Sequence, residues 1–425
     1  MMRSNYIGKR KYTYQEMKTS SVGDLELLCQ ELSAKIQELN NADENNDLSA
    51  RRKATAVARK LYTELVHPDE VAAEQMVTMS EWASIRMFIE WKIFDLIPLD
   101  GNVSWRELAA SVGVQEELVS RLGRMLVSTG GLRQPAPGRV AHSRLSLAYR
   151  SGDCNGALFF TAYDTLQPAL VSLPGFFNKY EPRLPRGKTY TPVTFAAGVD
   201  GRLTHWEVLE QRGPTHLEQF GLSMQGMIDF AWPYTGVYDF AWVEEYAAGA
   251  AERPLIVDVG GSYGHALRAN LVKYPGIPPA RCVVEDRPEM IASIEKAHAD
   301  DPVMRDVQKI ACDFHAEQSV KGALIYFIRR CLHDYDDDDC VGMLKILAAA
   351  LPEDEPRARI LINDQIMTDP PDRWVATMDI TMLAWSSLER TEEQFATVVR
   401  RAGLDVVKVH KVEGQTMGVV ECKKV

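Results

Sequence analysis

The N-terminal part of the chain carries the hydrophobic period of α-helices. Between residues 21 and 66, apolar side chains recur every three or four positions, which places them on one helix face, and a polar run at 43–47 predicts a loop. Further helical patterns, and a segment behind a Gly-Gly break, lie at Trp82–Ile97, Trp105–Val112, Gln115–Thr129 and Leu132–Ala141. The pattern predicts a helical arm over residues 1–70 and a second, mainly helical domain over residues 71–215.

The period changes in the C-terminal part of the chain. After a segment at 174–215 that is rich in Pro, Gly and isolated charges, short runs of β-branched residues alternate with stretches of helix length. The clearest runs are Leu255–Val259, Cys282–Glu285, Ala323–Ile328 and Arg359–Asn363. Strands that alternate with helices predict an α/β fold with a doubly wound, Rossmann-like parallel sheet. We expect this sheet in a catalytic domain over residues 216–425.

Composition excludes several classes of protein. Hydrophobic residues make up 46% and charged residues 25% of the chain, as in ordinary globular domains, and no apolar run approaches the roughly 20 residues of a membrane span. The polar N-terminus, Met1–Gln15, lacks the apolar core of a secretory signal, so we expect a cytoplasmic protein without a membrane partner. The seven cysteines are scattered and form no CxxC pair, which disfavours a disulfide framework and a structural zinc site.

The order of the helical patterns before residue 150 resembles a winged helix-turn-helix, a module that binds DNA in other proteins. Its second helix, predicted at Gln115–Thr129, begins with acidic residues and carries few basic ones, and the chain has a formal net charge of -11. Both features oppose contact with a polyanion. We therefore expect no nucleic-acid partner, and a small neutral or cationic ligand fits this charge better.

A glycine-rich turn follows the first predicted strand of the catalytic domain. Asp258, Gly260, Gly261 and Gly264 lie where this strand turns into a helix. Glycines there let the backbone approach a nucleotide and aim helix N–H groups at it. Asp286 follows this turn by about 20 residues, the distance expected of an acid that accepts hydrogen bonds from ribose hydroxyls. Taken alone, such a turn is equally typical of a tight strand-to-helix connection.

Three motifs together resemble a known family. Asp-Val-Gly-Gly at 258–261, Asp-Arg-Pro at 286–288 and Arg-Arg-Cys-Leu-His-Asp-Tyr-Asp-Asp at 329–337 are similar to the plant-type and fungal small-molecule O-methyltransferases. The match spans most of the chain. It implies an S-adenosylmethionine-dependent enzyme with a Rossmann-like catalytic domain and a winged-helix-like dimerisation domain. A homodimer is expected, because the 21–66 segment resembles family segments that embrace a partner subunit.

The same resemblance assigns a cofactor site. Asp258 and the three glycines of the turn would surround the methionine and ribose moieties of S-adenosylmethionine, and Asp286 would hold the ribose hydroxyls. Asp313 and Phe314 occupy the place of the family's acidic-apolar pair near the adenine. Arg329 falls where the family often has a lysine.

His333 is the candidate catalytic base. Methyl transfer from a sulfonium to a hydroxyl needs a correctly placed nucleophile and removal of its proton, and an imidazole suits that task near neutral pH. Asp364 and Glu389 follow later strands, and the resemblance assigns them to flanking and orienting the base. Many members have glutamate at the first of these positions, so we expect Asp364 to contact His333 less directly. A histidine taken alone is as typical of a surface or a helix cap.

An acidic run, 336–339, follows this histidine. Such a run is more typical of a solvated helix start, where acids offset the helix dipole, than of a metal site. Sites for hard cations usually need ligands from additional segments. We expect no metal.

Met224, Met227, Trp232 and Trp385 are the candidate contacts of the acceptor molecule. Methionine adapts its shape and aromatic rings stack, which suits a flat apolar acceptor. An ordinary interdomain core explains the same residues equally well.

The main functional hypothesis is an O-methyltransferase that acts on a hydroxyl of a small aromatic or polyketide-type secondary metabolite. The alternative keeps the fold and cofactor: some relatives look like pericyclases, in which bound S-adenosylmethionine acts electrostatically and is not consumed. The presence of His333 with Asp364 and Glu389 argues against this alternative. A regulatory binding module would need a basic recognition helix and a damaged donor site, and the sequence has neither.

Overall fold

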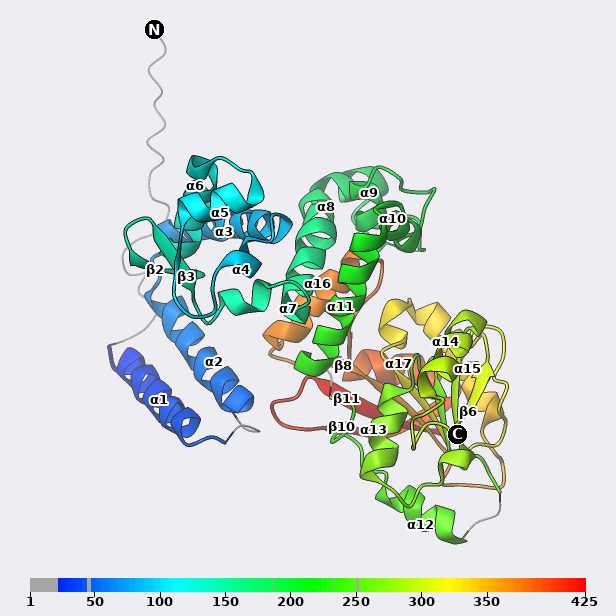
Figure 1. Ribbon diagram of the computed structural model, residues 1–425. Coiled ribbons are helices and arrows are strands. Elements are labelled where there is room, and N and C mark those ends of the chain that lie inside the picture. The colour runs from blue at the N-terminus through cyan, green and yellow to red at the C-terminus, as the bar shows by residue number, and fades with distance from the viewer. Residues whose placement is uncertain (1–21, 44–46, 186, 232, 250–251) are drawn as a thin grey trace. The chain divides into compact units, whose positions relative to one another are not determined.

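The computed structural model describes the chain except for residues 1–21, 44–46, 186, 232 and 250–251 (Figure 1). It divides into two compact units. The first comprises Met1–Met87 and Glu117–Gly130, and the second comprises Phe88–Glu116 and Gly131–Val425. The domain boundaries expected near residues 70 and 215 stay predictions.

The first unit is built from helices. Their bounds are α1 (Val22–Asn40), α2 (Asp47–Leu65), η1 (Pro68–Glu70), α3 (Val71–Glu90) and α6 (Glu116–Ser128). The helical pattern predicted over 21–66 forms two helices that pack on each other, α1 and α2. Part of the loop expected at 43–47, residues 44–46, lies outside the described residues.

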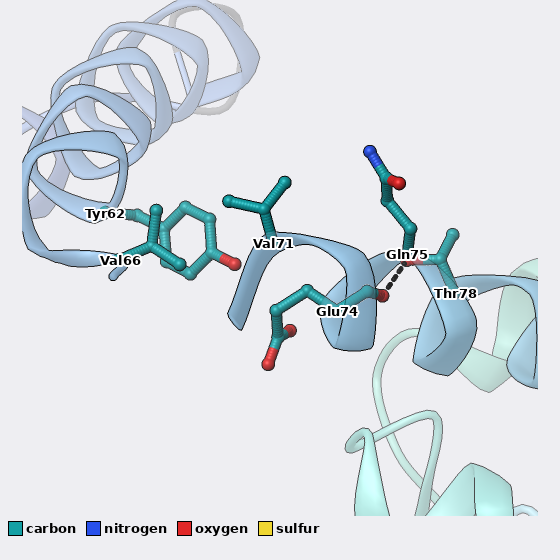
Figure 2. Close-up of a pocket in the computed structure, with 6 residues that line it drawn as sticks. All are labelled: Tyr62, Val66, Val71, Glu74, Gln75 and Thr78. Carbon is teal, nitrogen blue, oxygen red and sulfur yellow. Dashed lines mark hydrogen bonds between the residues drawn. The ribbon is translucent and has the colours of Figure 1, made fainter. Parts of the chain in front are cut away.

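A hollow of about 230 Å³ lies where α2 leads into α3, and Figure 2 shows the residues that line it. Tyr62 and Val66 come from the α2 side, and Val71, Glu74 and Thr78 come from α3. None of the candidate site residues lines this hollow, and all of the described ones belong to the second unit.

The second unit begins with short helices and a small antiparallel sheet. The helices are α4 (Ile93–Leu96) and α5 (Trp105–Val112), and the sheet has the order β1 (Val103–Ser104), β3 (Arg139–His142), β2 (Leu132–Ala136). α5 has the predicted bounds because Ser104 and Glu107 form a capping box at its start. The segment expected at Leu132–Ala141 is the β2–β3 hairpin.

A helical layer follows in the chain. Its elements are η2 (Ser146–Tyr149), α7 (Cys154–Thr161), the π-helical turn η3 (Ala162–Leu166), α8 (Gln167–Tyr180), α9 (Pro192–Ala196), α10 (His205–Gln211) and α11 (Pro214–Ala231). Figure 1 shows α16 (Arg373–Ala384), which is much later in the sequence, among α7, α8 and α11. Ala384 of α16 packs with Ala169 of α8 and Val193 of α9. The helical layer and the C-terminal part therefore share a core.

The main sheet lies in the C-terminal half. Its strands are β4 (Ile256–Val259), β5 (Cys282–Asp286), β6 (Gln308–Ala311), β7 (Ile325–Arg329), β8 (Arg359–Met367), β9 (Arg390–Thr391), β10 (Leu404–Lys411) and β11 (Met417–Lys424). The order is β10-β11-β8-β7-β4-β5-β6, with β9 beside β8. β4 to β9 pair in parallel, whereas β10 and β11 are antiparallel. The predicted doubly wound sheet is confirmed.

Helices cover both faces of this sheet. They are α12 (Ala241–Gly249), α13 (His265–Lys273), α14 (Pro288–His298), α15 (Asp337–Ala350) and α17 (Glu392–Arg401), with the short turns η4 (Pro279–Arg281) and η5 (Leu332–Asp334). Consecutive residues of β7 alternate between two buried clusters: Tyr326 and Ile328 belong to one, Phe327 to the other. This two-sided burial explains the continuous apolar runs of the central strands. No described helix is both long and apolar enough to cross a membrane.

The sheet positions the candidate site. β4 lies between β5 and β7. From β4 the chain adds β5 and β6 on one side of the sheet, and it then crosses over to add β7 and β8 on the other side. Ligands of such sheets bind in the crevice at the carboxyl ends of the strands, where the order reverses. The candidate residues follow the carboxyl ends of β4, β5, β6 and β7.

Candidate active site

The turn after β4 needs glycine at several positions. Gly260 and Gly264 both have φ of 66°, in the left-handed region that favours glycine. A Cβ on Gly261 would lie 2.7 Å from Cγ of Asp258, which is closer than real contacts allow. Ser262 is also left-handed, with φ of 47°. The turn is therefore tight, and the protein's own atoms leave little room for a side chain at its glycines.

Asp258, the penultimate residue of β4, has one carboxylate oxygen without a hydrogen-bond partner among the described residues. The residue is 2% exposed, and this oxygen is Oδ2. Burial raises the pKa of Asp258 to about 7, although the positive charge of Arg329 opposes this. Buried polar atoms are nearly always satisfied. An oxygen of this kind fits an N–H or ammonium group supplied by a ligand.

Asp286 ends β5 beside the same turn. Its Oδ2 accepts a hydrogen bond from the backbone N–H of Ser262 at 2.8 Å, and its Oδ1 accepts one from the N–H of Arg287 at 2.8 Å. The N–H of Gly261 donates to the carbonyl of Glu285 at 3.0 Å. Each carboxylate oxygen of Asp286 keeps a lone pair for another donor. The carboxylate thus links the turn to β5 and can accept hydrogen bonds from a diol.

Phe314 and Asp313 follow β6. A Cβ on Gly260 would lie 3.1 Å from Cε1 of Phe314, so the ring reaches the glycine turn. Asp313 accepts a hydrogen bond from the N–H of His315 at 3.0 Å through Oδ1. The structure therefore brings Phe314 to the turn, as its candidate role requires.

Arg329, the last residue of β7, is largely buried. Its Nη1 donates to Oδ1 of Asn363 at 2.7 Å, and its guanidinium lies 5.2 Å from the ring centroid of Tyr234. Burial lowers the pKa of Arg329 to about 10. The side chain is therefore still cationic at neutral pH, and its charge acts on Asp258.

His333 lies in η5, directly after β7, and is 7% exposed. Its Nδ1 is 3.3 Å from Oε1 of Glu389, and its Nε2 is 3.5 Å from Oδ1 of Asp334. The first contact does not have hydrogen-bond geometry, and it becomes an ion pair when the imidazole is protonated. Burial and Arg330 lower the pKa of His333, but the two carboxylates outweigh them and raise it above its ordinary value. The imidazole thus has a carboxylate on each side.

Glu389 is 4% exposed and is held from two directions. Nη1 of Arg330 donates to both of its oxygens, at 3.1 Å and 3.3 Å, and its own N–H donates to Oδ1 of Asp379 at 2.9 Å. Burial would raise the pKa of Glu389, but Arg330 and His333 lower it below the ordinary value. Glu389 is therefore an anion beside the imidazole.

Asp364 lies in β8 and is 1% exposed. Neither of its carboxyl oxygens accepts a hydrogen bond in the described part of the chain, and Oδ1 lies 3.8 Å from Nη1 of Arg330. Burial raises the pKa of Asp364 to about 6, although His333 and Arg330 oppose this. Asp364 thus joins the group electrostatically, with Arg330 between it and Glu389.

The acceptor candidates meet in a buried group, here called the methionine cluster. Its buried members are Met227, Met378, Met382 and Met417, and the partly buried Leu158, Met224, Val237, Trp374 and Trp385 pack against them. The C-terminal end of α16 contributes Met382 and Trp385 to this cluster, and Ser387 and Leu388 just beyond it donate hydrogen bonds to the carbonyls of Asp334 and His333. Three of the four candidates are thus brought together beside the catalytic group. The fourth, Trp232, lies outside the described residues.

A second imidazole faces the same region. The ring of His205, at the start of α10, lies edge-on to Trp385 with centroids 6.3 Å apart. Burial lowers the pKa of His205 to about 4, against the opposing charge of Asp334, so this ring is neutral at pH 7. A neutral imidazole can donate or accept a hydrogen bond. No motif distinguishes this histidine from the other eight in the sequence.

The acidic run after His333 has the predicted structural role. α15 begins at Asp337, and Oδ1 of Asp336 accepts hydrogen bonds from the N–H groups of Asp338 and Asp339, both at 3.0 Å. Asp336 is therefore an N-cap. Within the described ranges, no three or more His, Cys, Asp or Glu side chains are grouped to hold a metal ion.

Two arginines of the site were not predicted. Arg330 binds Glu389, and Arg390 holds the turn that carries His333. Each is the sequence neighbour of a predicted residue, Arg329 or Glu389. That adjacency is the only signal the sequence offered, because their partners are distant in sequence.

Comparisons with known proteins identify relatives of this chain. A family model described as an O-methyltransferase domain matches residues 246–405. Methyltransferase cfoD of Aspergillus candidus is 43% identical over 404 residues, which cover 94% of this chain and 98% of that protein. The crystal structure of OxaC in complex with SAH and oxaline has a TM-score of 0.79 at 24% identity, covering 95% of this chain and 99% of OxaC. A structure described as a pericyclic reaction enzyme has a TM-score of 0.74 at 23% identity, and the match covers 94% of this chain and 99% of that enzyme.

The chain belongs to the O-methyltransferase family, as the three sequence motifs predicted. More closely, it is an S-adenosylmethionine-dependent methyltransferase of the small-molecule type found in secondary metabolism. The likeness to OxaC and to the pericyclic enzyme shows the fold alone.

Proposed function

We propose that this enzyme methylates a hydroxyl oxygen of a small aromatic or polyketide-type metabolite, with His333 as the general base. The observation that carries the proposal is the 3.3 Å contact between Nδ1 of His333 and the buried anion Glu389. An imidazole paired at Nδ1 is oriented to accept a proton at Nε2. The methionine cluster beside the base suits an apolar acceptor.

The residues around the glycine turn fit the cofactor. Asp286 has lone pairs free for the ribose hydroxyls, and the unsatisfied Oδ2 of Asp258 suits the amino group of the methionine moiety. Gly260, Gly261 and Gly264 form a tight turn at the end of β4, and the ring of Phe314 lies near this turn. When bound, S-adenosylmethionine supplies an electrophilic methyl group on a sulfonium.

The chain itself performs the proton chemistry. Neutral His333 accepts the hydroxyl proton at Nε2, which leaves a nucleophilic oxygen. Glu389 at Nδ1 and Asp334, whose side chain is 56% exposed, then stabilise the imidazolium. Arg330 keeps Glu389 ionised, which prevents the proton from passing to that carboxylate. Positioning of the acceptor against the donor supplies the rest of the rate increase.

Methyl transfer is tested with S-adenosylmethionine that carries a labelled methyl group. The enzyme is incubated with a panel of phenols and polyketides, and with amines of matched size, and products are analysed by mass spectrometry and NMR. Label on an oxygen is expected. Label on nitrogen alone would overturn the oxygen assignment. Tight cofactor binding by calorimetry with no label transfer to any compound would instead favour the pericyclase alternative.

We also infer a homodimer, whose contact surface includes the N-terminal helices. Leu27, Leu65, Met76 and Met79 are all more than half exposed, at 64%, 62%, 68% and 61%. Exposed apolar groups of this size commonly mark a contact with another chain. Light scattering of the full chain is expected to give twice the monomer mass of 47.7 kDa. A monomer at micromolar concentration would contradict the inference.

A further inference from the structure

The turn that carries His333 is held through its backbone. Each carbonyl of residues 332–335 accepts a hydrogen bond from the segment 387–390. Arg390 binds the first and the last carbonyl, through Nη1 at 2.9 Å and Nη2 at 2.8 Å. The N–H of Leu388 and Oγ of Ser387 bind the two between them, at 3.2 Å and 3.0 Å. One segment thus fixes the whole turn.

Arg390 is the anchor of this arrangement. It is 1% exposed and is the largest fully buried side chain. Its Nε and Nη2 lie 2.9 Å and 2.8 Å from Oδ1 of Asp337, the first residue of α15. The guanidinium fork therefore joins two carbonyls and a carboxylate from the chain on both sides of His333. An ammonium group cannot reproduce this geometry, because it lacks the planar fork.

Glu389 and Arg390 are adjacent but contact the turn in different ways. Glu389 faces the imidazole of His333, and Arg390 faces the backbone that carries it. The distance between Nδ1 of His333 and Oε1 of Glu389 therefore depends on the carbonyls that Arg390 holds. We propose that Arg390 is a positioning residue that keeps His333 in register with Glu389, an inference that rests on the proposed role of His333.

If His333 shifts relative to Glu389, both kcat and the pKa of His333 should change. A misplacement of about 1 Å can cost on the order of 10²-fold in rate. The groups that face His333 are Glu389, Asp334, Arg330 and Asp364. Burial and Arg330 lower its pKa, whereas Asp334 and Glu389 raise it. If the turn moves away from Glu389, this carboxylate raises the pKa of His333 less, so that pKa should fall.

The test compares Arg390→Lys with a matched control, Arg359→Lys. Arg359 also binds a carboxylate and two carbonyls: Nε donates to Glu421 at 2.8 Å, and Nη1 donates to Pro356 and Ala358 at 2.7 Å and 2.9 Å. It lies at the start of β8, at the opposite strand end from the site. The two variants thus remove the same chemistry from two places.

The primary measurement is the pKa of His333 by NMR on the full chain with ¹³C-labelled histidine. The His333 signal is assigned by its absence in His333→Ala. Arg390→Lys is expected to lower this pKa and to reduce kcat on a methylated substrate about 10- to 100-fold, with KM for S-adenosylmethionine within about 3-fold. Arg359→Lys should change neither the pKa nor kcat.

An unchanged His333 pKa in Arg390→Lys, or equal losses of kcat in both variants, would overturn the positioning role. If Arg390→Lys fails to fold, Asp337→Asn takes its place, because its side chain is 45% exposed and it orients the same guanidinium. A fall in the His333 pKa is expected there too, and no change overturns the inference. The pKa measurement by NMR does not depend on turnover. It therefore tests the role of Arg390 even if His333 proves not to be the catalytic base.

Discussion

Replacing His333 with alanine is expected to lower kcat by a factor of about 10²–10⁴, while cofactor affinity stays within a few-fold. The variant removes the group that accepts the hydroxyl proton, but the glycine turn, Asp258 and Asp286 stay in place. Single-turnover kinetics with labelled S-adenosylmethionine measure the chemical step, and calorimetry measures cofactor binding.

His298 supplies the matched control for this variant. It is also a buried histidine, 6% exposed, but it lies at the end of α14. His298→Ala should lower the melting temperature and leave kcat unchanged. Unaltered kcat in His333→Ala would remove the assignment of the base.

The same base predicts a pH dependence. Only the neutral imidazole accepts a proton, and the carboxylates Asp334 and Glu389 raise the pKa of His333 above its ordinary value of 6.5. kcat should therefore fall as the pH decreases through that raised pKa. His205, with a pKa of about 4, is neutral throughout this range and does not contribute. A pH profile with no acid limb between pH 6 and 9 would contradict this account.

Asp286→Ala is expected to weaken S-adenosylmethionine binding about 10- to 100-fold. Hydrogen bonds to a charged group contribute about 1.5–3 kcal/mol, and each 1.4 kcal/mol is tenfold in affinity. The variant removes the acceptor of the ribose hydroxyls, and it also frees the N–H groups of Ser262 and Arg287. Calorimetry with S-adenosylmethionine measures the change.

Asp301 provides the control for Asp286. Its Oδ1 likewise accepts from two backbone N–H groups, those of Val303 and Met304, both at 2.9 Å. Asp301→Ala should lower thermal stability and leave cofactor affinity within a few-fold. Wild-type affinity in Asp286→Ala would show that this carboxylate does not hold the cofactor.

Much of the fold could be predicted because buried parallel strands have a local signature. The runs at β4, β5, β7 and β8 are continuous and apolar, and the strands lie where those runs do. The edge strands have no such signature. β10 has one buried residue among its eight, and β6 has none among its four, so neither is distinct from a loop in sequence.

The sequence indicates which residue types carry the chemistry of the site, but it reveals few of the contacts between them. Motif residues such as His333 and Asp286 carry side chains whose chemistry is informative by itself. Arg330 and Arg390 act through partners that sequence spacing does not reveal. Arg390 binds backbone carbonyls, which every residue possesses, so no residue type marks its target. Only the folded turn after β7 defines that target.

The methionine cluster has an evolutionary consequence under the proposed function. Methionine side chains are unbranched and flexible, so one substitution in the cluster can be accommodated by small shifts of its neighbours. Such changes need not move His333, because Arg390 holds its turn through hydrogen bonds to backbone carbonyls. Descendants of one ancestral gene can thus drift toward new acceptors while the proton-transfer apparatus is inherited intact.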